Sequence, residues 1–394
     1  MCGTMKCRTE IFMRHTKILL WAVAAAWACS SSARACSVPV FRYALERWEN
    51  APYQAVIFHR GPLADADKLC LETLKNAGDA PKGTTNIVVD SVDVDTLAGL
   101  KAAPNAVPGA GQAMAKLWAA QKNPALPWTV LLYPQGNDDL EPFWSGPLNL
   151  ERIARLIASP ARTEIARKLT TGDSAVWAVL LSGDRQKDDG AIKMLETELA
   201  KLQKTIVLPT DADTQGGPVV QRRSDLPLKI SFSIVPVSRS DPAEAMFAAM
   251  LIGIDKRFRD AAQPAAFPIF GRGRALTGLL GKDFATATIG EATVFLTGAC
   301  SCQVKELNPG VDLLFNTDWE GLVSGEKSVE NSKAAVEIPM PKLPASAEKK
   351  PVEITDKDSE KMALNGRVWL LAGLLLSGAM AIVMGAWLLK LKRK

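Results

Sequence analysis

Histidine is nearly absent from this sequence. The 394-residue chain contains two histidines, His15 and His59. A histidine-based zinc site needs several imidazole ligands, and Ser-His or Cys-His catalysis needs an imidazole base. The composition therefore argues against a histidine-based metal centre and leaves His59 as the one candidate base beyond the N-terminal segment. We predict no bound metal ion and no cofactor.

Cysteine is also scarce. Of seven cysteines, three precede residue 35, so that a chain cleaved there keeps Cys36, Cys70, Cys300 and Cys302. Four cysteines in this length do not make a disulfide scaffold, although one or two bridges would be stable in an oxidising compartment.

The pair Cys300 and Cys302 is the candidate redox site. Two thiols separated by one residue would close a small strained ring, whose bond would be labile, and Cys36 could supply a third thiol. Two alternatives stay open: a structural bridge from one of the pair to Cys36 or Cys70, and free or metal-binding thiols. The flanking leucines place Cys70 in the core of a helix-packed domain.

Positive charge is scarce between the two ends of the chain. Residues 1–35 hold five bases and one acid, which gives +4, and residues 367–394 hold five bases and no acid, which gives +5. Since the whole chain carries +5, the region between these ends carries −4. Nucleic-acid binding needs a concentrated positive surface. We therefore expect no nucleic-acid partner.

The N-terminal residues 1–35 have the pattern of a signal peptide. Basic residues precede a short apolar run over Ile18–Ala28, and small residues follow up to Ala35 in an A-x-A arrangement. We predict cleavage after Ala35. A lipoprotein with an acylated Cys36 is the alternative.

The C-terminus has the pattern of a membrane anchor. Val368–Leu389 comprises 22 residues without a charge, which span about 33 Å as a helix, enough for a bilayer core of roughly 30 Å. We predict a transmembrane helix over 367–389 and a basic cytoplasmic tail over 390–394, because positive residues stay inside. The preceding Pro/Lys/Glu-rich stretch 324–366 is expected to be a flexible linker. The protein is thus expected in the bacterial inner membrane as a single-pass protein with a periplasmic ectodomain.

The predicted anchor carries small residues every fourth position. They are Gly373, Ser377, Ala381 and Gly385. Such a stripe lets two transmembrane helices approach closely. We expect self-association or a membrane-protein partner in addition to the bilayer itself.

The ectodomain is expected to contain two α/β domains, 36–172 and 173–323, the second with a C-terminal extension. Each has the element order β-α-β-α-β-β-α, which in the first domain follows a leading helix over 40–48. The expected strands lie at 54–58, 87–89, 128–133 and 141–144, and at 175–181, 228–237, 265–270 and 274–280. The expected helices lie at 40–48, 64–76, 113–121 and 150–157, and at 188–202, 243–252 and 289–296.

This order, with Pro127 just before the third strand, resembles the thioredoxin fold, in which that proline is usually cis. The resemblance implies two tandem thioredoxin-like domains and a Cys-x-x-Cys motif after the first strand of each. Those places hold His59–Leu63 (HRGPL) and Ser182–Arg185 (SGDR), without cysteine. The missing nucleophile favours a binding scaffold over an oxidoreductase.

The segment Gly271-Arg272-Gly273-Arg274 is a weaker candidate. Arg272 and Arg274 could clamp a carboxylate or phosphate, because glycines allow a close backbone approach. A hairpin turn with two solvated arginines explains the pattern equally well.

Three segments resemble a group of bacterial envelope proteins. They are Ala35–Trp48 (ACSVPVFRYALERW), Gly271–Leu276 (GRGRAL) and Cys300–Glu306 (CSCQVKE). The resemblance implies a periplasmic setting and no particular activity. The sequence therefore favours a membrane-tethered, non-enzymatic binding or scaffold protein, such as an accessory subunit of an envelope complex. The alternative is thiol–disulfide exchange through Cys300 and Cys302.

Overall fold

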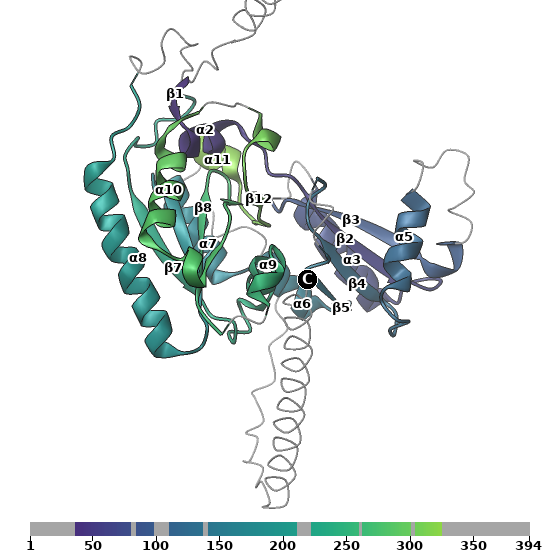
Figure 1. Cartoon of the computed structure of the whole chain (residues 1–394). Coiled ribbons are helices and arrows are strands. Elements are labelled where there is room, and N and C mark those ends of the chain that lie inside the picture. Colours follow the sequence, from purple (N-terminus) through teal and green to yellow (C-terminus); the bar gives the residue numbers. More distant parts are fainter. Residues whose placement is uncertain are drawn as a thin grey trace, which may run out of the picture. The chain divides into compact units, whose positions relative to one another are not determined.

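The chain has a mixed α/β fold with two main sheets (Figure 1). The computed structural model describes residues 36–79, 84–97, 110–136, 141–210, 222–259, 262–300 and 304–324, which all belong to one compact unit. The predicted signal peptide, linker, transmembrane helix and tail lie outside these ranges. No helix within them is long and apolar enough to cross a membrane.

The first sheet has the strand order β3-β2-β4-β5. Its strands are β2 (Tyr53–His59), β3 (Ile87–Asp93), β4 (Trp128–Leu132) and β5 (Trp144–Pro147). Strand β2 is parallel to β3 and antiparallel to β4, and β4 is antiparallel to β5. The apolar run in β2 fits its central place, because helices cover both faces of the sheet there and a strand buried on both faces carries apolar residues throughout.

Helices cover both faces of this sheet. The first-sheet helices are α3 (Asp65–Gly78), α5 (Ala110–Ala119) and α6 (Leu150–Ile157). Ala55 and Ile57 of β2 belong to the core that includes α3 and α6. Val56 and Phe58 point to the other face, where the Phe58 ring lies 5.1 Å from the Trp118 ring of α5. The alternation follows from the two-residue repeat of a strand.

The second sheet repeats the arrangement of the first. Its main path is β7-β6-β8-β9-β12, and β10 (Leu279–Leu280) pairs with β8. Strand β6 is parallel to β7 and antiparallel to β8, which is antiparallel to β9. The first four strands of this path thus have the order and directions of β3-β2-β4-β5. The strands of the path are β6 (Ala175–Leu180), β7 (Phe232–Val237), β8 (Ala265–Phe270), β9 (Arg274–Ala275) and β12 (Val311–Asp312).

The second sheet is also covered on both faces (Figure 1). Val176 and Ala178 of β6 pack in the core shared with α7 (Pro160–Thr170) and α9 (Ala245–Gly253). Trp177 points to the opposite core. The helices of that opposite core are α2 (Val40–Arg47), α8 (Arg185–Thr205) and α10 (Thr286–Thr297).

The N-terminal segment therefore belongs to the core of the second sheet. Strand β1 (Cys36–Pro39) pairs antiparallel with β11 (Ala299–Cys300), and Phe41 of α2 packs with Trp177 and Phe270. The sequence analysis assigned helix α2 to the first domain, 36–172, because it precedes β2 in the chain.

The C-terminal extension makes the converse connection. Asn316 forms a bridge with Thr85, and the Asn86 side chain donates to Leu313 O and accepts from Phe315 N. Helix α11 (Trp319–Val323) follows. The extension therefore connects the two sheets: its strand β12 pairs with β9 of the second sheet, and residues 313–316 contact the residues just before β3.

Candidate functional site

Three segments that are distant in sequence meet at one place, which we call the polar junction. They are the end of helix α2, the turn between β8 and β9, and the C-terminal extension. The residues lining the junction are Ala44, Trp48, Glu49, Asn50, Arg272, Arg274, Lys305 and Asp312. The junction thus gathers parts of all three segments that the sequence analysis singled out.

Two glycines let the β8–β9 turn approach its neighbours. Gly271 has φ +58°, and a Cβ there would lie 2.6 Å from the Ala44 Cβ of helix α2. Gly273 has φ +93°, and a Cβ there would collide with the Phe315 ring. Both positions need glycine, because L side chains disfavour this φ and no room is left for one.

Arg272 fastens the turn to the end of helix α2. Its Nε donates to Leu45 O at 2.9 Å, and its Nη2 lies 3.1 Å from Glu320 Oε2 of helix α11. In return, the Asn50 side-chain amide donates to Arg272 O at 2.5 Å. Since the last carbonyls of a helix lack partners within the helix, the guanidinium satisfies one of them.

Asp312 is the centre of the junction. Its carboxylate accepts hydrogen bonds from Arg274 Nη1 at 2.8 Å, from Lys305 Nζ at 2.7 Å and from Ala51 N at 2.7 Å. Its side chain is 5% exposed, whereas those of Arg274 and Lys305 are 11% and 15% exposed. A buried carboxylate with two cations is electrostatically compensated.

The remaining donors of Arg274 hold the backbone of the extension. Nη2 donates to Asn308 O at 2.9 Å and Nε to Pro309 O at 3.1 Å. The alternative expectation of solvated arginines is therefore wrong, because Arg272 is buried, Arg274 is half-buried, and both donate to groups of the protein itself. The cavity of the junction has a volume of ≈ 10 Å³, room for about one water molecule. The carboxylate held by Arg274 is the chain's own.

The cysteines lie in two separate places. In the β1–β11 pair, Cys36 is directly opposite Cys300, which is buried in the core of the second sheet. Cys302 lies outside the described residues. Cys70 is buried in the core beneath the first sheet, which confirms its core assignment. Burial, aided by Asp67, raises the pKa of the Cys70 thiol.

The loop after β2 is held by a side chain from the end of the neighbouring strand β3. The Leu126–Pro127 peptide bond is cis, the isomer predicted for it. The next residue, Trp128, pairs with Phe58, so the proline lies near the end of β2 from which this loop leaves. His59 Nδ1 lies 2.8 Å from Gly61 O, and Gly61 N donates to Asp93 Oδ2 at 3.0 Å. The loop amide thus binds a carboxylate from the end of β3.

The loop after β6 is also held by a carboxylate. Asp188 Oδ1 accepts from Ser182 N and from Ser182 Oγ, both at 2.8 Å, and its Oδ2 accepts from Gly183 N at 3.1 Å. Asp184 caps helix α8 by accepting from the amides of residues 186 and 187. In both halves of the protein, therefore, an internal carboxylate binds amides of the loop: the Gly61 amide after β2, and the Ser182 and Gly183 amides after β6.

Sequence reasoning missed the partners within these sites. It named the arginines of the turn but not Asp312 or Lys305, and it took Asp188 as part of a helix start. One signal was available for Asp312: a single carboxylate precedes the apolar run Leu313–Phe315. A charge in a buried segment needs a partner of opposite charge.

Comparisons with known proteins leave the function to be inferred from this geometry. The chain matches no model of a known protein family and no curated protein. Across the part of the chain that the structure describes, no three His, Cys, Asp or Glu side chains gather as metal ligands would.

The predicted membrane-packing residues Gly373, Ser377, Ala381 and Gly385 lie outside that part.

Proposed function

We propose that this protein is a non-enzymatic binding or scaffold protein built on two thioredoxin-like domains. It would be tethered to the bacterial inner membrane by its C-terminal segment and act in the periplasm as an accessory subunit of an envelope complex. The shared strand order and directions of the two sheets support the paired domains. The position of the cis proline beside the end of β2 agrees with the same fold.

The observation that carries this proposal is the closure of both loops by carboxylates. In a thioredoxin-type enzyme, amides at the start of the helix after the first strand stabilise a thiolate. Here Asp93 and Asp188 accept hydrogen bonds from amides of the two loops, and both loops lack a cysteine. A negative carboxylate at this position disfavours a thiolate or an oxyanion. These contacts support a structural role for the two places where the thioredoxin resemblance expects the Cys-x-x-Cys motif.

The polar junction supports a scaffold in another way. It connects the N-terminal helix, the second sheet and the extension that reaches the first sheet, through Arg272, Arg274 and Asp312. These contacts fix the two halves with buried charge-assisted hydrogen bonds. A fixed pair of domains offers a partner a constant surface.

The proposal is tested by crosslinking the full chain in its native membrane. We expect a specific envelope partner that is lost when Gly373 and Ala381 are replaced by Leu, because the predicted contact stripe is then filled. Val383→Leu is the matched control, since it lies off the stripe. The absence of any partner, or a partner retained in the double variant and lost in the control, would contradict the proposal.

Thiol–disulfide exchange through Cys300 and Cys302 is the alternative that the sequence analysis leaves open. The β1–β11 register places Cys36 opposite Cys300, which suits a structural bridge between these two cysteines better than exchange. A Cys300–Cys302 bond with a reduction potential above about −230 mV would support exchange. A stable bridge from either residue to Cys36 or Cys70 would rule it out.

A further inference from the structure

The paths of the two main sheets end in four edge strands, β3, β5, β7 and β12. An unpaired strand edge can pair with another chain, which short strands, prolines and capping side chains prevent. Strand β12 has two residues. Strand β7 contains Pro236, which has no backbone N–H, and its first amide, Phe232 N, donates to the Gln203 side chain at 3.0 Å. These two edges are therefore protected against strand addition.

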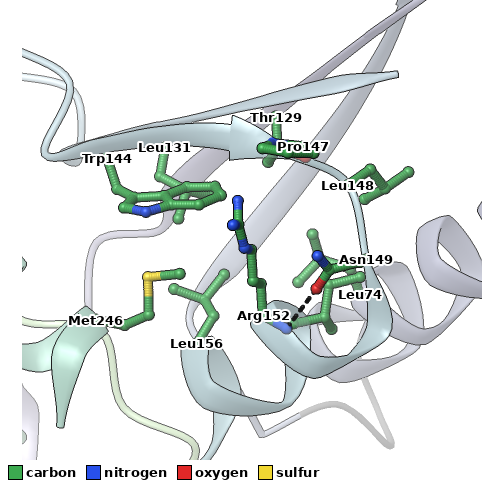
Figure 2. A pocket seen from close by; sticks show the side chains of 11 residues that line it. Leu74, Thr129, Leu131, Trp144, Pro147, Leu148, Asn149, Arg152, Leu156 and Met246 are labelled. Carbon is green, nitrogen blue, oxygen red and sulfur yellow. Dashed lines mark hydrogen bonds between the residues drawn. The ribbon is translucent and has the colours of Figure 1, made fainter. Parts of the chain in front are cut away.

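Strand β5, the third edge, is short and ends in a proline. It has four residues, the last of which is Pro147. Figure 2 shows Pro147 and Trp144 above helix α6, with the Arg152 side chain reaching up beside the Trp144 ring. The guanidinium carbon lies 5.5 Å from the ring centroid. The cavity beside this stack has a volume of ≈ 10 Å³, so it admits no ligand larger than about one water molecule.

Strand β3, the fourth edge, is longer and contains no proline. It has seven residues, Ile87–Asp93, and pairs only with β2. Tyr53 N donates to Asn86 O at 2.9 Å, which sets the alternation of the parallel ladder. Every second residue from Asn86 bonds to β2, so the backbone groups of Val89 and Ser91 point away from it. Neither residue's N–H or C=O bonds to a described residue on that outer side. The edge therefore offers two donors and two acceptors.

Extended chain already pairs along the line of this edge, just before β3 begins. Asn316 of the C-terminal extension forms an antiparallel bridge with Thr85, and Asn86 N donates to Phe315 O at 3.3 Å. The residues that precede this contact belong to β12, which pairs with β9 of the second sheet. The antiparallel pairing by the extension therefore ends where β3 starts, and another extended segment can continue it.

The side chains along the edge favour a basic partner. Val88 and Asp90 lie on one face of β3, because residues two apart share a face, and Val88 is 47% exposed. The exposed Asp90 accepts from Gln54 Nε2 at 2.6 Å but forms no ion pair with any residue that the structure describes. A second copy of β3 would bring Asp90, Asp93 and Asp95 of both chains together, and like charges on facing strands are destabilising. The charge thus disfavours self-pairing and favours a strand that carries a cation.

We propose that the outer edge of β3 is a docking site at which an extended, basic segment of a partner protein adds antiparallel as a fifth strand of the first sheet. Val89 and Ser91 each exchange two backbone hydrogen bonds with the added strand. That strand places Lys or Arg across from Asp90 and, two residues later, an apolar side chain across from Val88. The inference names the class of partner for the proposed binding function and rests on that function.

Hydrogen exchange and fluorescence anisotropy of the full chain test the site with the peptide acetyl-Thr-Lys-Thr-Val-Thr-Val-amide. Its lysine lies across from Asp90 and its first valine across from Val88. We expect the peptide to slow amide exchange within 87–93. Methylation of the backbone nitrogen of its third residue, which faces Val89, should weaken binding about threefold to tenfold, because a ladder hydrogen bond is lost. Methylation at the fourth residue, whose N–H faces away from β3, is the matched control and should weaken binding less than about twofold.

A charge exchange identifies the facing residue. Replacing the peptide's lysine by glutamate should weaken binding about fivefold, and Asp90→Lys should reverse the preference of the chain for the two peptides. Glu72→Lys makes the same change of charge at an exposed position of helix α3 and should alter neither affinity by more than about twofold. Circular dichroism melting curves check that both variants fold, and the methylated peptides test the site on the unchanged chain.

Several results would overturn the docking site. They are no protection of 87–93 by the peptide, equal weakening by the two methylations, or no change of preference in Asp90→Lys. Slow exchange of this edge in the chain without peptide would also overturn it: protection lost on dilution would indicate a second copy, and protection that persists would indicate a segment of the chain itself. Membrane crosslinking reports on the partner independently. A chain that crosslinks its partner without binding the peptide keeps the proposed function and loses this site.

Discussion

Asp312 should be the most sensitive charged position of the polar junction. Asp312→Ala removes three hydrogen bonds and leaves Arg274 and Lys305 without their shared counter-charge. Removing one partner of a fully buried ion pair costs about 3–5 kcal/mol. Because the side chains of the two cations retain 11% and 15% exposure, water can compensate them in part. We therefore expect the free energy of unfolding to fall by about 3 kcal/mol, at the lower end of that range.

Urea unfolding of the full chain, followed by tryptophan fluorescence, measures this change. The matched control is Glu141→Ala, since Glu141 also contacts two cations, Lys256 at 3.3 Å and Arg259 at 2.7 Å. The Glu141 side chain is 51% exposed, so its loss should shift the unfolding curve little. If Asp312→Ala unfolded at the same urea concentration as the control, the junction would not stabilise the fold and the reasoning would be refuted.

Three further predictions concern the turn and the cysteines. Gly273→Ala should lower the free energy of unfolding by about 2–4 kcal/mol in the same assay, because its Cβ meets the Phe315 ring at a positive φ; an unchanged curve would contradict this. Cys70 should react with iodoacetamide far more slowly in the folded chain than in urea, since burial hides the thiol and raises its pKa; equal rates by mass spectrometry would contradict its core position. Peptide mapping of the oxidised chain should find Cys36 bridged to the Cys300–Cys302 segment, because β1 pairs with β11; a bridge confined to that segment would contradict this.

Local patterns predicted most elements of the two sheets. The apolar runs of β2, β6 and β8 were expected within one or two residues of where they lie, because central strands are buried on both faces. Helix α6 was expected over 150–157 and lies there, and the Asn149 side chain caps it by accepting from Arg152 N. Capping and burial are properties of a few consecutive residues, which is why the sequence reveals them.

Element ends and long-range partners were less predictable. The last strand of the first sheet was expected over 141–144 but lies at β5 (Trp144–Pro147), because pairing with β4 fixes its position. Helix α8 begins at Arg185, ahead of the expected residue 188, since Asp184 caps it.

The junction itself depends on contacts between distant segments. Arg274 and Asp312 are 38 residues apart, and Arg272 and Leu45 are 227 residues apart. Hydrophobic periodicity depends on residues close together in sequence, so it does not predict which distant residues form such pairs. The same holds for helix α2. Its amphipathic pattern indicates a buried face, but it does not indicate that this face packs against the second sheet. Sequence reasoning could therefore name the arginines of the turn without their partners.

Catalysed disulfide reduction is the measurement that tests the proposed non-enzymatic role most directly. The full chain would be added to insulin and dithiothreitol, beside a Cys300→Ser variant, and the rate of insulin reduction would be followed by turbidity. Because carboxylates occupy the loop amides after β2 and β6, we predict the same rate with either chain as with dithiothreitol alone. A rate increase that Cys300→Ser abolishes would contradict the account and establish thiol–disulfide exchange.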